Sequence, residues 1–123
     1  MSQPVRILIA DDHNEVLMAV ADLVDAQDGV DIVCLTTTVE ETVRSVAWHK
    51  PDLAFVDAWL SGGGAEAVAR QVAELSPQTY VVALASAKEL ATVLKLQAVG
   101  AACYDKEALS AVLPGILESV GRR

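Results

Sequence analysis

Five short runs of mostly apolar residues recur along the chain at regular spacing, and they predict the strands of a sheet. The runs occupy residues 5–10, 30–35, 53–56, 80–85 and 101–104. The first, third and fourth runs are almost continuously apolar, which is typical of strands that are buried on both faces. The second run alternates more between apolar and polar positions, so we expect this strand to lie nearer an edge of the sheet.

Apolar residues recur every three or four positions in the segments between and after these runs, which indicates amphipathic helices. The segments with this helical spacing are residues 16–24, 39–47, 65–75, 90–97 and 109–120. Asp28-Gly29 and Gly100 are typical helix-ending residues after the first and the fourth of them. Pro114 lies inside the last segment, where it is expected to start or kink the helix.

The alternation of strand and helix predicts an α/β fold made of one domain, residues 1–123. At this length, parallel strands joined by right-handed helical crossovers close naturally into a flavodoxin-like (βα)5 doubly wound sandwich. Its five-stranded parallel sheet is expected to have the order 2-1-3-4-5. Apolar residues make up 53% of the chain but aromatic residues only 4%, so the core is expected to be aliphatic.

The formal net charge of −8 narrows the range of partners. Binding to nucleic acid needs clustered Lys and Arg, so we expect no direct nucleic-acid binding by this segment. The acidic balance is compatible with a divalent cation or with a basic partner. No N-terminal signal peptide is recognisable and no apolar stretch reaches the ~18 residues of a membrane span, so we expect a cytoplasmic protein without a membrane partner.

The cysteines and histidines show no spacing typical of a metal site. Cys34 and Cys103 lie far apart in apolar runs, so buried structural thiols are expected rather than a disulfide or metal ligands. His13 and His49 have no second imidazole or cysteine nearby in the sequence. We interpret both histidines as surface residues and not as metal ligands.

Acidic residues follow two neighbouring strands of the predicted sheet. Asp11 and Asp12 come directly after the first strand, and Asp57 comes directly after the third. In an open α/β sheet, ligands bind outside the carboxyl ends of the strands where the strand order reverses, and these two strands flank that point. Mg²⁺ takes oxygen ligands from carboxylates and would relieve the repulsion between the like charges. With Lys106 just past the fifth strand, the group has the equipment for phosphoryl transfer to an aspartate.

Each of these aspartates also has a simpler interpretation when taken alone. Asp11 or Asp12 could cap the first helix, and Asp57 could cap a turn. The coincidence of three carboxylates and a lysine at the predicted reversal point favours a functional site over three separate caps.

Three spaced motifs give the chain a resemblance to a known family. They are residues 6–13 (RILIADDH), 51–57 (PDLAFVD) and 100–106 (GAACYDK). The sequence resembles the receiver domain of bacterial two-component response regulators, in the CheY-like superfamily. The resemblance covers essentially the whole chain, and the combination of motifs is far more specific than any one of them.

By this resemblance, Asp57 accepts a phosphoryl group from a sensor histidine kinase, with Mg²⁺ as the cofactor. The ligands of Mg²⁺ would be Asp11, Asp12, Asp57 and the main-chain carbonyl of Trp59, and Lys106 would pair with the phosphoryl group. Phosphorylation would then switch an output surface. The domain would catalyse only its own phosphorylation and dephosphorylation, so we do not expect an enzyme acting on other substrates.

The resemblance also implies two switch residues, a hydroxyl at the end of the fourth strand and an aromatic residue in the fifth. Tyr104 is the aromatic residue. Counting back from Gly100 without gaps puts the hydroxyl position on Ala85, whose neighbour is Ser86. We choose Ser86, because it carries the hydroxyl near that strand end, and Ala85 stays the alternative.

Two further partners are left open by the resemblance. One is a second copy of the chain, through the face made by the fourth helix, fifth strand and fifth helix. The other is a C-terminal DNA-binding effector domain outside this chain, which would make the protein a transcription regulator.

Two other functions compete with a phosphorylated receiver. The first is a pseudo-receiver, the same fold used as a phosphorylation-independent protein-interaction module. The second is an enzyme on a related α/β fold. The sequence disfavours the enzyme, because it has no G-x-G-x-x-G turn for a dinucleotide and no D-x-D motif after the first strand.

Overall fold

The computed structural model describes residues 3–85 and 90–121 of the chain. Five strands alternate with five helices and one short 3₁₀ helix. The strands are β1 (Val5–Ala10), β2 (Val30–Thr36), β3 (Leu53–Asp57), β4 (Tyr80–Ala85) and β5 (Ala102–Asp105). The helices are α1 (Asn14–Asp25), α2 (Val39–His49), α3 (Gly64–Leu75), α4 (Leu90–Ala98), η1 (Lys106–Ala108) and α5 (Leu109–Gly121).

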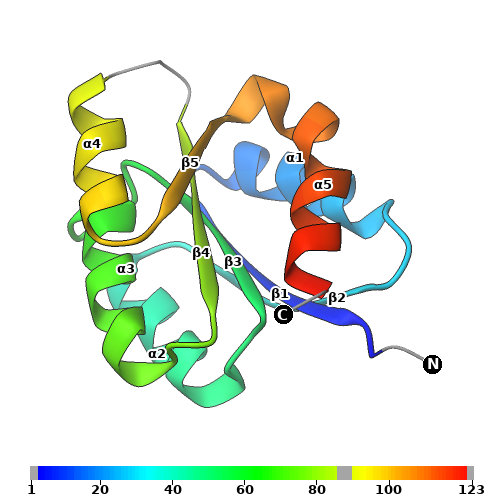
Figure 1. Ribbon diagram of the computed structural model, residues 1–123, viewed down its shortest axis with the longest axis horizontal. Coiled ribbons are helices and arrows are strands. Elements are labelled where there is room, and N and C mark those ends of the chain that lie inside the picture. Colours follow the sequence, from blue (N-terminus) through cyan, green and yellow to red (C-terminus); the bar gives the residue numbers. More distant parts are fainter. Residues whose placement is uncertain (1–2, 86–89, 122–123) are drawn as a thin grey trace.

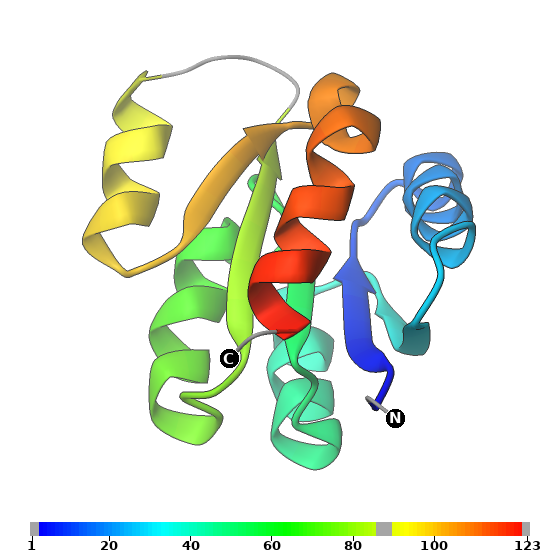
Figure 2. The same ribbon diagram turned by 45° about the vertical axis from the view of Figure 1, so that its right-hand side comes forward.

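All strand pairs are parallel, and the sheet has the order β2-β1-β3-β4-β5. The predicted flavodoxin-like order is therefore confirmed, and β2 lies at an edge as its alternating pattern suggested. Figure 2 shows β5 at the other edge, between α4 and α5. Ala10 pairs with Val56, and Asp57 pairs with Leu84, so the carboxyl ends of β1, β3 and β4 lie side by side.

Helices cover both faces of the sheet, with α1 and α5 on one side and α2, α3 and α4 on the other (Figure 1). The side chains of β1 alternate between these faces, as the period of a strand requires. Ile7 and Ile9 pack in the cluster beneath α1 and α5, whereas Leu8 and Ala10 pack in the cluster beneath α2 and α3. Strands buried on both faces hold the carboxyl ends of β1 and β3 in fixed positions.

Pro114 and the two cysteines depart in part from the expectations. Pro114 lies within α5, which begins five residues earlier, so Pro114 does not start the helix. Cys34 and Cys103 are free thiols as expected, but both are half-buried rather than fully buried. Burial raises the pKa of the Cys103 thiol, which keeps it protonated near neutral pH.

The helices of the described residues are also short relative to a lipid bilayer. Within residues 3–85 and 90–121, no helix combines the length and apolar character that crossing a membrane requires.

Candidate functional site

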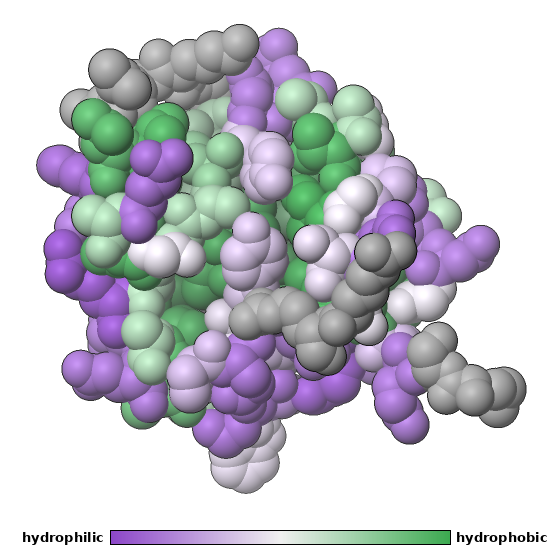
Figure 3. Space-filling view, in the orientation of Figure 1, coloured by the Kyte–Doolittle hydropathy of each residue, from purple (hydrophilic) through white to green (hydrophobic). Residues whose placement is uncertain are grey.

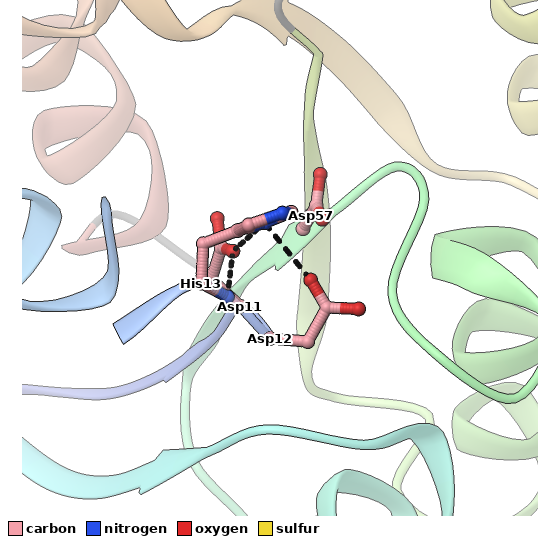
Figure 4. A group of neighbouring side chains, drawn as sticks. All are labelled: Asp11, Asp12, His13 and Asp57. Carbon is pink, nitrogen blue, oxygen red and sulfur yellow. Dashed lines mark hydrogen bonds and ion pairs between the residues drawn. The ribbon is translucent and has the colours of Figure 1, made fainter. Parts of the chain in front are cut away.

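Three carboxylates meet beyond the carboxyl ends of β1 and β3. Asp11 and Asp57 are buried, with side chains only 3% and 4% exposed, whereas Asp12 is partly exposed. Figure 4 shows the three side chains gathered with His13 at this edge of the sheet. The sheet topology explains why the three carboxylates lie close together, because neighbouring parallel strands bring the residues at their carboxyl ends to the same place.

Lys106 joins the two buried carboxylates. It follows β5 directly as the first residue of η1, and its Nζ lies 3.0 Å from Asp11 Oδ2 and 3.0 Å from Asp57 Oδ1. Burial acts to lower the pKa of Lys106, but the hydrogen bonds and charges of Asp11 and Asp57 outweigh it, so the pKa is raised above its ordinary 10.5. The ammonium therefore stays charged and offsets part of the negative charge of the site.

Asp12 is held differently, by the loop between β3 and α3. The hydroxyl of Ser61 donates a hydrogen bond of 2.6 Å to Asp12 Oδ2. This bond is the main reason that the pKa of Asp12 lies below its ordinary 3.8; burial acts in the opposite direction, and the charge of His13 lowers it further. Ser61 was not predicted as a site residue, because it lies 49 positions away from Asp12 along the chain.

His13 also takes part in the cluster, which the interpretation as a plain surface residue did not foresee. Its ring is exposed, at 72%, but Nδ1 lies 3.0 Å from Asp12 Oδ1 and 3.3 Å from Asp11 Oδ1 (Figure 4). Its backbone N–H donates to Asp11 Oδ1 at 2.9 Å. His13 is itself the N-cap residue of α1, so neither Asp11 nor Asp12 is the cap of that helix. An Asx-turn at Asp11, which brings residue i+2 back to its carboxylate, was the signal that could have located His13.

The donor set fits a hard divalent cation. Ligand atoms of Asp11, Asp12, His13 and Asp57 all lie within 4.8 Å of one another. Asp12 Oδ1 is fully buried, and it makes no hydrogen bond within the described part of the chain, although the His13 ring is at ion-pair distance. A buried carboxylate oxygen without a hydrogen bond is costly unless a cation occupies the space beside it. The acidic cluster could therefore bind a metal ion.

Trp59 and the loop that carries it border the site. The Trp59 side chain is 57% exposed, and its backbone N–H lies 3.4 Å from Asp57 Oδ1. A cleft of 410 Å³ lies between this loop and α4, lined by residues that include Trp59, Ser61 and Lys95. Gly64 ends the loop with a φ of +74°, where the backbone passes close to the Ala58 carbonyl.

The two predicted switch residues have different outcomes. Ser86 lies outside the described residues, so its assignment stays a prediction. Ala85, the alternative, is the buried last residue of β4. Tyr104 is half-buried in β5 and packs against the core cluster beneath α1 and α5.

The Ser61–Asp12 bond leads to a prediction about acid stability. Replacing Ser61 by alanine is expected to raise the pKa of Asp12, because its strongest hydrogen bond is lost. A carboxyl group whose pKa is lower in the folded state stabilises the fold above about pH 3.8, and this contribution disappears as the pH falls through the folded pKa. The variant should therefore lose less stability than the native chain on acidification below pH 3.8.

NMR titration of the Asp12 carboxyl carbon measures the change in its pKa directly. Ser119→Ala, at an exposed position of α5, is the control, and equal Asp12 titrations in both variants would contradict the role of Ser61.

Comparisons with known proteins agree with this geometry. The family model described as "Response regulator receiver domain" matches residues 7–106. The response regulator GacA of Pseudomonas viridiflava is 28% identical over 100 residues, covering 81% of this chain and 47% of GacA. This chain therefore spans about half the length of the curated relatives it matches.

Solved structures show the same fold at lower identity. The signal receiver domain of the putative response regulator NarL from Mycobacterium tuberculosis superposes with a TM-score of 0.90, at 22% identity, over 98% of this chain and 99% of that one. The isolated receiver (REC) domain of RcsB from Salmonella enterica serovar Typhimurium has a TM-score of 0.86, at 15% identity, over 98% and 90% of the two chains. With its family model covering most of the sequence, the chain belongs to the response regulator receiver domain family.

Proposed function

We propose that this domain accepts a phosphoryl group on Asp57, from a sensor histidine kinase and with Mg²⁺ in the acidic cluster. One observation carries the proposal: the Lys106 ammonium lies 3.0 Å from two buried carboxylates, beside an Asp12 oxygen that has no hydrogen bond among the described residues. A structural ion pair would need only one carboxylate for one lysine. The surplus of negative charge indicates a site prepared for cations and for the transfer of an anionic group.

In the proposed reaction, an Asp57 carboxylate oxygen attacks the phosphorus atom in line. An O–P bond forms as the bond from phosphorus to the imidazole nitrogen of the donor breaks, and the freed electron pair stays on that nitrogen. Lys106 is placed to pair with a phosphoryl oxygen, since it already contacts Asp57. Mg²⁺, when bound, would neutralise charge on the transferring oxygens. The domain would act on its own aspartate and on no other substrate, both in phosphorylation and in the later hydrolysis, in which water attacks the phosphorus atom and inorganic phosphate leaves Asp57.

The signal would pass to the face formed by α4, β5 and α5. A phosphoryl group adds negative charge and acceptor oxygens, and it shifts a two-state equilibrium through its different contacts in the two states. Ser86 and Tyr104 are the proposed switch residues. Tyr104 borders a hollow of 320 Å³ that Val112 and Ile116 of α5 also line, so a change in its ring position would alter this face.

The same face is the proposed contact for partners of the switched domain. Figure 3 shows apolar and polar side chains interspersed where α4, β5 and α5 lie. Leu94 of α4 is 56% exposed and is therefore accessible to a partner on this face. Homodimerisation through this face would suit a cytoplasmic transcription regulator. A DNA-binding effector domain outside this chain is a further proposed partner, and the greater length of GacA supports it. The fold is also similar to that of a DNA-binding response regulator of the LuxR family from Staphylococcus aureus, at 17% identity and a TM-score of 0.86.

Acetyl phosphate tests the proposal without the unknown kinase. With Mg²⁺, the native chain is expected to gain the mass of one phosphoryl group, whereas Asp57→Asn gains none. Beryllofluoride, the phosphomimetic present with the RcsB receiver domain, should change the NMR spectrum of the native chain only. Asp105→Asn, at the neighbouring carboxylate that caps η1, is a matched control and should still be phosphorylated. An unmodified native chain with unchanged spectra would overturn the proposal and favour a pseudo-receiver.

A further inference from the structure

We propose that His13 is a nitrogen ligand of the cation site, and that it makes the site bind Co²⁺, Ni²⁺ and Zn²⁺ more tightly than its carboxylates alone would. The inference rests on the cation site of the proposed function and specifies which metal ions that site prefers. The metal preference would come from the His13 imidazole, because carboxylates without a nitrogen ligand form a site suited to Mg²⁺.

The position of the ring carries the inference. His13 Nδ1 lies 3.0 Å from Asp12 Oδ1 and 3.3 Å from Asp11 Oδ1. Neighbouring ligand atoms around a first-row metal ion lie roughly 2.9–3.4 Å apart when each bond is about 2.1 Å long. The same ring nitrogen thus lies at ligand-to-ligand distance from one oxygen of Asp11 and one oxygen of Asp12.

The surroundings of Asp12 Oδ1, which faces the ring, are a second argument for a cation bound by both residues. Asp12 Oδ1 is buried and forms no hydrogen bond with any described residue, even though Nδ1 is 3.0 Å away. With a proton on Nδ1 the ring donates to Asp11 Oδ1, whereas in the tautomer with the proton on Nε2 the Nδ1 lone pair faces the carboxylate oxygens and is repelled by them. A metal ion between Nδ1 and Asp12 Oδ1 converts this repulsion into two coordination bonds.

The remaining side-chain contacts of the two carboxylates of Asp11 and Asp12 involve their other oxygens. Lys106 forms ion pairs with Asp11 Oδ2 and Asp57 Oδ1, and the Ser61 hydroxyl donates a hydrogen bond to Asp12 Oδ2. The oxygens of Asp11 and Asp12 that face His13 are the two Oδ1 atoms. Asp11 Oδ1 also accepts the backbone N–H of His13 at 2.9 Å, which holds this residue beside the carboxylate, whereas Asp12 Oδ1 accepts no hydrogen bond from a described residue.

The chemistry of the donor set decides the metal preference. Imidazole suits Zn²⁺, Ni²⁺ and Cu²⁺, whereas Mg²⁺ prefers carboxylate and water oxygens. A nitrogen ligand therefore adds to the affinity for the later first-row ions and adds little to the affinity for Mg²⁺. Because the ring is largely exposed, we expect a gain of about tenfold to one hundredfold, in the range that neighbouring groups of a metal site contribute.

Direct metal binding tests the inference. Isothermal titration calorimetry would measure the affinity of the native chain, His13→Ala and His49→Ala for Mg²⁺, Co²⁺, Ni²⁺ and Zn²⁺ separately. The chain has two histidines, and His49 lies at the far end of α2, so His49→Ala is a matched control. We expect His13→Ala to bind Co²⁺, Ni²⁺ and Zn²⁺ at least about tenfold more weakly, with Mg²⁺ affinity changed by less than about twofold. His49→Ala should bind all four ions as the native chain does.

A spectroscopic measurement distinguishes coordination from a simple charge effect. The absorption spectrum of the Co²⁺ complex should change between the native chain and His13→Ala, because a nitrogen ligand is lost. If His13 were only a cationic partner of the aspartates, its removal would tighten the binding of every ion, Mg²⁺ included. That result, or equal affinities in the native chain and His13→Ala, would overturn the inference. His13→Gln is a second variant with a polar side chain, and circular dichroism checks the folding of both.

The outcome can be separated from that of the proposed function. Phosphorylation by acetyl phosphate with Mg²⁺ reports on Asp57, whereas calorimetry with Zn²⁺ reports on His13. A chain that binds Zn²⁺ through His13 but is never phosphorylated would reject the proposed function and keep this inference. A phosphorylated chain whose Zn²⁺ affinity is independent of His13 would support the proposed function and reject this inference.

Discussion

Replacing Gly64 by alanine is expected to lower the free energy of unfolding by about 2–5 kcal/mol. Gly64 has a φ of +74°, where a side chain adds roughly 1–2 kcal/mol of strain, and a Cβ there would lie 2.3 Å from the Ala58 carbonyl oxygen. That carbonyl already accepts a hydrogen bond from the backbone N–H of Ala65, so it cannot move away without breaking the bond. Such overpacking adds about 1–3 kcal/mol. Urea denaturation followed by circular dichroism measures the loss.

Gly29 offers a matched control for this substitution. Its φ is also +74°, but a Cβ there would have no atom within 4 Å. Gly29→Ala should therefore show only the backbone strain, about 1–2 kcal/mol. The difference between the two variants isolates the contact with Ala58. Equal losses would mean that the loop between β3 and α3 moves aside at no cost, contrary to the expectation.

Replacing Lys106 by methionine has the second large expected effect. Without the ammonium, the buried carboxylates of Asp11 and Asp57 lose a partner 3.0 Å from each of them. Removing one partner of a buried ion pair costs about 3–5 kcal/mol, and because Lys106 keeps some exposure we expect about 3 kcal/mol in a chelating buffer. Saturating Mg²⁺ should restore part of this stability, because a bound cation relieves the same repulsion and stabilises the folded state by mass action.

The pH dependence of the Lys106 variant gives an independent check. A lysine whose pKa is raised on folding stabilises the folded state fully below its ordinary pKa of 10.5, and this contribution is lost as the pH rises through the raised value. The difference in stability between the native chain and Lys106→Met should therefore shrink above pH 10.5. Lys95→Met, at an exposed position of α4, is the matched control and should be nearly neutral. Indistinguishable losses in the two variants would contradict the ion-pair interpretation.

The fold could be predicted from the chain because its strands differ in apolar pattern. Continuous apolar runs marked the strands buried on both faces, the alternating run marked the edge strand β2, and the parallel topology then determined the order. The same reasoning placed Asp11 and Asp57 together, since Asp11 directly follows β1, Asp57 ends β3, and these two strands are neighbours in the sheet. Lys106 could be assigned to the site by its place just after β5 and by the family resemblance.

The parts of the site that could not be predicted depend on loop geometry. Ser61 reaches Asp12 from the loop after β3, in which the glycines that follow it have positive φ angles, and no periodic pattern describes such a loop. His13 follows the acidic pair in the sequence, but the direction of its ring is set by the turn at Asp11 and not by spacing. Residues on strand ends were therefore predictable, whereas residues that enter the site from loops were not.

The irregular pairing of β1 with β2 affects how the molecule behaves at high concentration. Ile7 pairs with Ile32 but Leu8 pairs with Cys34, so Val33 is an extra residue that bulges from the edge strand. A bulge bends and twists the edge, and the exposed charge of Asp31 lies beside it, which hinders another sheet from adding there. The opposite edge, β5, is only four residues long and lies between two helices. Contacts between copies of the domain should consequently form through side chains, without the runaway strand addition that leads to fibrils.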